Sequence, residues 1–221
     1  MSTDDALGGS AAGGRFERGR QLVARHPVAS VAAAAVAGAA LGVIARVWMR
    51  WISVDPEFSW AGTLGILAGF TVFAAAQACA AVVRVRSPRR PRTLAMRTTA
   101  ALLSGGLFGA AGAVMLPTVV FGSIATWRTG LRRIVRLLLG ALALPSVVFV
   151  VIGIVDDHGW SLETIAQLLA FVSIYVVVVA ATWPTAAPVE GGWRPSRRAV
   201  VVVVGAVIAF LGLALYLGGV Q

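Results

Sequence analysis

The residue types best suited to chemistry lie together in the stretch that begins at Arg46. Asp55 and Glu57 are separated there by Pro56, which favours a tight turn. Arg46 and Arg50 precede the two acids and stand four residues apart, so they share one face of a helix. Aromatic side chains border these charges: Trp48, Trp51, Phe58 and Trp60.

This combination predicts acid chemistry in an apolar setting. A carboxyl group among aromatic rings has a raised pKa, stays protonated and can act as a proton donor. Arginine can keep a second carboxylate ionised or bind an anionic head group. Asp55 and Glu57 are therefore the candidate catalytic residues. The candidate substrate-binding residues are Arg46, Arg50, Trp48, Trp51, Phe58 and Trp60.

A purely structural interpretation of the same stretch stays open. Trp and Arg at the end of a membrane-spanning helix form an interfacial belt. An Asp-Pro pair begins turns, Ser59 can cap the following helix, and Arg50 can simply pair with Asp55.

A second polar stretch runs from Asp156 through Asp157 and His158, with Glu163 following. Oxygen and imidazole ligands can hold a metal, but the spacing matches no known metal-binding motif. We expect a turn between two helices, with Ser161 as the N-cap of the second. The chain also has a single cysteine and two histidines. We therefore expect neither a metal nor another cofactor.

The elements that must position these residues are apolar helices. The chain has 221 residues, of which 58% are hydrophobic and 13% charged, too apolar for a soluble domain. A spanning helix needs about 20 mainly apolar residues. We therefore predict an all-α, polytopic transmembrane bundle of five to six apolar segments. They lie near residues 28–47, 60–83, 98–127, 137–155, 162–183 and 199–217.

Residues 1–25 are rich in Gly, Ser and Ala and predict a disordered basic tail on the cytoplasmic side. Residues 26–221 are expected to form one transmembrane domain. The first apolar segment is long enough to span, which favours an uncleaved helix with Pro27 in its first turn.

The arginines predict the orientation of the bundle. All 19 cationic residues are arginine, which with the many Ala, Gly and Val residues indicates a GC-rich, bacterial coding sequence. If all six segments cross with the N-terminus inside, ten arginines lie inside and nine outside. If the third segment returns to its own side, seventeen lie inside, as the positive-inside rule favours. Its glycines and Pro117 permit a broken or re-entrant segment, although one long tilted helix stays an alternative.

Three small-residue pairs are expected to pack helices closely within the chain, with dimerisation as the alternative. They are Gly38 with Gly42, Gly65 with Gly69, and Gly105 with Gly109.

In size, helix count and the loop Arg46…Asp55-Pro56-Glu57-Phe58-Ser59-Trp60, the chain resembles the small membrane-associated terpene cyclases of actinobacteria, the drimentine-type indole-sesquiterpenoid cyclases. The resemblance implies an indole-farnesyl substrate that is cyclised by protonation. The residues themselves suit such a metal-independent reaction, because aromatic faces stabilise a carbocation.

Two other function classes stay open, a transporter-like protein and a non-catalytic integral membrane protein. The expected partners are the lipid bilayer and a hydrophobic small molecule, in the bacterial plasma (inner) membrane. Nucleic acid is not expected, because the arginines cluster at the ends of apolar segments. The sequence does not determine the oligomeric state.

Overall fold

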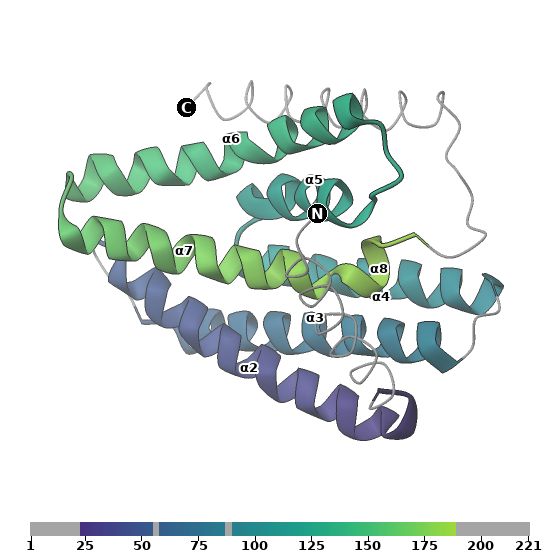
Figure 1. Cartoon of the computed structure of the whole chain (residues 1–221). Helices are drawn as coiled ribbons and strands as arrows, with labels where there is room; N and C mark the ends of the chain where they lie inside the picture. Colours follow the sequence, from purple (N-terminus) through teal and green to yellow (C-terminus); the bar gives the residue numbers. More distant parts are fainter. Residues whose placement is uncertain (1–22, 55–57, 87–89, 189–221) are drawn as a thin grey trace, which may run out of the picture. The chain divides into compact units, whose positions relative to one another are not determined.

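The computed structural model describes residues 23–54, 58–86 and 90–188. The chain divides into two compact units, Met1–Pro188 and Val189–Gln221, and every described residue belongs to the first. The described residues are helical with short connections and form no strand (Figure 1). The last predicted segment, 199–217, and the tail before residue 23 lie outside the described ranges.

The helices follow one another with short connections. In order they are α2 (Pro27–Trp51), α3 (Trp60–Arg86), α4 (Arg90–Ala111), the 3-10 turn η1 (Ala113–Met115), α5 (Leu116–Trp127), α6 (Arg133–His158), α7 (Leu162–Ala181) and α8 (Trp183–Ala186). Among the described helices, α2, α3, α6 and α7 are long and apolar enough to cross a membrane. The prediction of an all-α chain with several helices able to span a bilayer is confirmed in this form.

Local sequence signals mark several helix ends. Pro27 occupies the first turn of α2, where its missing N–H has no helical partner to lose. Ser59 Oγ accepts a hydrogen bond from the backbone N–H of Gly62 at 3.3 Å, and so caps α3. Ser161 Oγ caps α7 in the same way through Thr164 N at 3.0 Å. All three roles agree with the predictions from the sequence.

Helices α2 and α3 pack antiparallel through two glycines of α2. A Cβ atom on Gly38 would lie 2.5 Å from Phe70 O and 2.6 Å from Ala74 Cβ. A Cβ atom on Gly42 would lie 3.1 Å from Leu67 Cα. The absence of side chains at both positions therefore lets the two backbones approach closely.

The Gly-rich third segment is interrupted at Gly112, whose φ of 105° suits glycine far better than other residues. The turn η1 follows it, and α5 then begins with Pro117 in its first turn. Helix α5 runs antiparallel to α6, because Thr118 Oγ1 donates to Ala143 O at 2.7 Å while Arg136 donates to Ala125 O at 3.2 Å.

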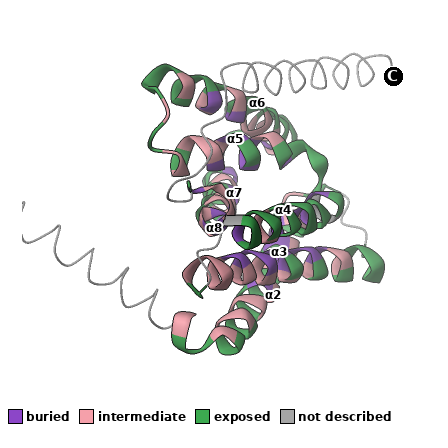
Figure 2. Ribbon diagram, turned by 90° about the vertical axis from the view of Figure 1, so that its right-hand side faces the viewer, coloured by how far each residue is buried: buried purple, intermediate pink, exposed green. Residues whose placement is uncertain are grey.

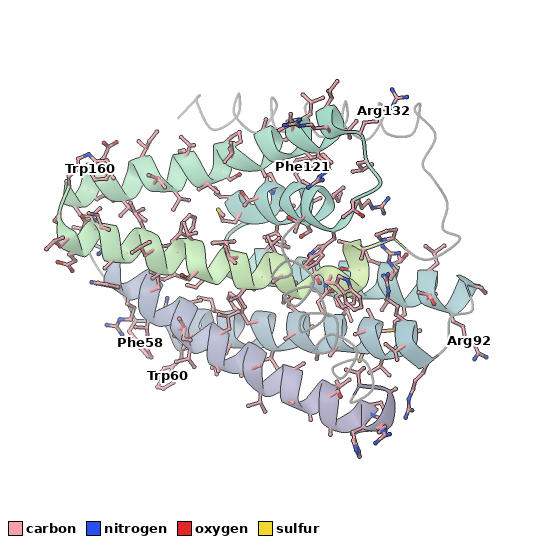
Figure 3. The ribbon with its side chains drawn as sticks, viewed as in Figure 1. Phe58, Trp60, Arg92, Phe121, Arg132 and Trp160 are labelled. Carbon is pink, nitrogen blue, oxygen red and sulfur yellow. The ribbon has the colours of Figure 1, made fainter. Side chains whose placement is uncertain are left out.

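The short helix α8 collects contacts from several parts of the chain. Arg97 of α4 donates to Thr185 O, and Arg128, which directly follows α5, donates to Ala186 O at 3.3 Å. The stretch from α4 through η1 to α5 therefore starts and finishes near the same point of the bundle. Figure 3 shows Arg92, near the start of α4, and Arg132, directly before α6, both toward the right of the view.

The core lies where α2 to α7 and η1 face one another, and Figure 2 shows buried residues on inward faces of these helices. Large apolar side chains also cover the outward faces. Examples are Val36, Leu102, Leu137, Phe149 and Val176, all more than 45% exposed. An apolar exterior of this kind suits contact with lipid and would be a liability in water.

Candidate functional site

The predicted site residues that the structure describes gather at one end of the bundle, which we call the tryptophan end. It consists of the C-terminus of α2 with Trp51, the N-terminus of α3 with Trp60, and the turn between α6 and α7 with Trp160. Phe58, Trp60 and Trp160 all lie toward the left of Figure 3. The two helices α2 and α7 are joined there by hydrogen bonds.

The candidate acids Asp55 and Glu57 lie outside the described residues, so their role stays a prediction. The residues on either side of them, Val54 and Phe58, are 69% and 51% exposed.

Arg50, Phe58 and Trp60 form a continuous set of contacts across this loop. The guanidinium carbon of Arg50 lies 5.6 Å from the centroid of the Phe58 ring, within range for a cation–π interaction. Phe58 in turn meets Trp60 edge to face, with 4.9 Å between ring centroids. Arg50 of α2 thus lies against Phe58, just before α3, and Phe58 in turn contacts Trp60, the first residue of α3.

Arg46 is directed to the start of α3 as well. Its Nε donates to Thr63 Oγ1 at 3.1 Å, and the Thr63 hydroxyl donates to Ser59 O at 2.9 Å. Arg46 therefore links α2 to the capped first turn of α3, which favours a positioning role for its side chain.

Trp48 is a core residue, only 8% exposed. Its ring stacks on Phe171 of α7 with 5.3 Å between centroids, and its Nε1 donates to Gln167 O at 2.8 Å. These contacts join α2 to α7 and leave little of the ring surface for a ligand.

Trp51 is 42% exposed and contacts two residues of α7. Its Nε1 donates to Glu163 Oε1 at 2.8 Å, and its carbonyl accepts a hydrogen bond from Gln167 Nε2 at 3.1 Å. Sequence reasoning did not connect Glu163 or Gln167 with the tryptophans. A usable signal was present, because Glu163, Gln167 and Phe171 are four residues apart and so share one face of α7.

Gln167 is fully buried, and its Oε1 has no hydrogen-bond partner in the part of the chain that the structure describes. A buried carbonyl oxygen without a partner costs about 1–3 kcal/mol, which an internal water molecule can offset.

The turn from Asp156 to Trp160 behaves as a helix connection. Both aspartates are exposed, and His158 Nδ1 lies 3.3 Å from Ile154 O in its own helix. Among the described residues, no three His, Cys, Asp or Glu side chains gather as a metal site would require.

The exposed faces of the tryptophan end are aromatic and open outward. Trp60 is 70% exposed, in contrast to the buried Trp48. An apolar molecule could approach these rings from the bilayer, with arginine close by for an anionic or π-rich group. Searches of protein families, curated proteins and solved structures find no match to this chain.

Proposed function

We propose that the protein is a multi-pass protein of the bacterial plasma membrane, with its arginine-rich end inside. Helices α2, α3, α6 and α7 cross the bilayer, while α4, η1 and α5 enter from the inner side and return to it. The observation that supports this topology is that Arg97 and Arg128 donate to neighbouring carbonyls of α8. The arginine distribution along the chain favours the same orientation.

Within this topology, the tryptophan end acts on a hydrophobic isoprenoid, which is cyclised after protonation. The observation that carries this proposal is the contact set of Arg50, Phe58 and Trp60 beside the loop that holds Asp55 and Glu57. The rings of Phe58 and Trp60 are exposed, so a prenyl chain dissolved in the bilayer can lie against them.

The chemistry needs only groups that the chain supplies. A neutral carboxyl group of Asp55 or Glu57 transfers its proton to an alkene carbon, which leaves a carbocation on the substrate. The π electrons of a second alkene close the ring, and aromatic faces stabilise the charge through cation–π attraction. Loss of a proton back to the carboxylate then gives a product isomeric with the substrate.

The experiment uses membranes that contain the full chain, supplied with farnesylated indole. We expect a product of unchanged mass and altered chromatographic retention. Asp55→Asn or Glu57→Gln should lower turnover by about a hundredfold or more, because general acid catalysis contributes roughly that much. Asp157→Asn is the matched control, since this exposed aspartate lies in the last turn of α6, away from the Asp55–Glu57 loop. Full turnover in both loop variants contradicts the acid assignment, and an inactive wild type contradicts cyclisation of this substrate.

A transporter-like role is the alternative, and the break at Gly112 favours it. Discontinuous helices in transporters line substrate sites near the middle of the membrane. No residue from 98 to 127 is ionisable, so such a path would suit an uncharged solute. Uptake of a labelled prenyl compound into sealed vesicles without chemical change would support this alternative.

A further inference from the structure

Three arginines from three different helical regions converge on the backbone around α8. Arg84, near the end of α3, donates to Ala187 O at 3.0 Å. Arg97 of α4 donates to Thr185 O, and Arg128 donates to Ala186 O at 3.3 Å. The carbonyls at the end of α8 thus hold three guanidinium groups close together.

No described carboxylate lies near Arg97 or Arg128. The described acids are Asp156, Asp157 and Glu163, and all three lie at the tryptophan end. Burial, together with Arg128 and Arg84, lowers the pKa of Arg97 to about 10. An anion beside Arg97 and Arg128 would offset the repulsion between these two guanidinium groups.

Arg97 and Arg128 also have N–H donors left with which to bind an anion. A guanidinium group has five N–H donors in a planar fork that suits phosphate oxygens. Each of these two arginines uses one N–H in its hydrogen bond to α8. Both side chains are half-buried rather than enclosed, so a ligand at the surface of the bundle can reach them.

Two tryptophans mark the depth of the cluster in the membrane. Trp183 lies under Arg84, with 4.9 Å from the guanidinium carbon to the ring centroid. Trp127 immediately precedes Arg128, and its Nε1 donates to Val179 O at 2.9 Å. Tryptophans are enriched at the level of the lipid head groups, which is also where phospholipid phosphates lie.

We propose that Arg97 and Arg128 bind the phosphate of an anionic phospholipid at the inner face of the membrane, while Arg84 holds α8 beside them. A lipid is the expected source, because the cluster lies at the edge of an apolar bundle whose outer faces suit acyl chains. This site is separate from the tryptophan end and requires no catalytic activity.

The test titrates the full-length protein in neutral detergent with phosphatidylglycerol and follows the thermal unfolding midpoint. Phosphatidylglycerol should raise the midpoint more than phosphatidylcholine does. The double variant Arg97→Gln, Arg128→Gln should weaken the apparent affinity about 25-fold, at roughly fivefold per arginine. The control Arg132→Gln, Arg133→Gln removes the same charge from exposed residues of the same end. At about 0.15 M salt it should change affinity about threefold or less, because exposed charges are screened.

Three results would overturn the proposal. Equal losses of affinity in the two double variants would show that binding depends only on general surface charge. Equal shifts of the unfolding midpoint with both lipids would show that the protein has no preference for an anionic lipid. Full stabilisation by inorganic phosphate alone would show that the site binds a free anion rather than a lipid. If the Arg97 variant fails to fold, a photoreactive phosphatidylglycerol is crosslinked to the wild type instead. Labels should map to peptides around Arg97 and Arg128, and labelling centred on Trp160 would reject the site.

Discussion

Most of α4, the turn η1 and α5 separate Arg97 from Arg128 along the chain, yet both arginines donate to carbonyls of adjacent residues, Thr185 and Ala186. One arginine lies in the second turn of α4 and the other directly follows α5. The intervening chain must therefore reverse direction, and the reversal occurs at Gly112 and η1. The proposed topology can therefore be tested by asking whether both ends of this stretch lie on the same side of the membrane.

Cysteine labelling should place both ends of this stretch on the cytoplasmic side. In a Cys79→Ala background, Arg92→Cys and Thr129→Cys should react with an impermeant maleimide only from the inside. Trp160→Cys should react only from the outside, because it lies in the turn between α6 and α7, which cross the bilayer in the proposed topology. All three native residues are exposed. Labelling of Thr129→Cys from the outside would show that the third segment crosses completely.

Gly38→Ala should destabilise the bundle by roughly 1–3 kcal/mol, because the new methyl group overpacks the contact with Phe70 and Ala74. The measurement is the free energy of unfolding in mixed micelles of increasing SDS content. Gly105→Ala is the matched control, since no described atom lies within 4 Å of its added Cβ. It should be neutral or slightly stabilising, as alanine favours helix. Equal effects of the two changes would contradict the α2–α3 packing.

Two substitutions at Gln167 should distinguish the energetic cost of its unpartnered Oε1 from the stabilisation by its Nε2 hydrogen bond to Trp51 O. Gln167→Leu loses the hydrogen bond to Trp51 O but also removes the unpartnered Oε1, so the net change should be within about 1 kcal/mol. Gln167→Glu at neutral pH buries a carboxylate and should cost about 3 kcal/mol or more. The same SDS titration measures both. A Leu variant as unstable as the Glu variant would mean that the amide holds α2 to α7.

Local signals predicted the helices and several of their ends. The apolar runs, Pro27, Ser59 and Ser161 all act over a few neighbouring residues, and the structure agrees with each. The glycine pattern was only partly informative. Gly38 and Gly42 pack tightly, whereas Gly105 and Gly109 face open space within the described chain. Spacing identifies a face that can pack, but it does not say which helix will cover that face.

At the tryptophan end, too, the sequence predicted some features and the tertiary structure decided others. Its residue composition could be predicted from the sequence, while the acid role of Asp55 and Glu57 stays a prediction. The tertiary structure decided that Trp48 is buried against Phe171 while Trp60 is exposed. It also brought Glu163 and Gln167 to Trp51 from more than a hundred residues away.

The sequence by itself determined an all-α chain with helices able to span a bilayer, because hydrophobic length and helix capping are local properties. Only the tertiary structure decided which helices became neighbours and where arginines from separate helices converged. Those choices depend on side-chain fit and hydrogen bonds between segments that are distant along the chain. No local periodicity specifies such pairings, and they are what bring Arg97 and Arg128 to the same short helix, α8, and join Trp48 to Gln167.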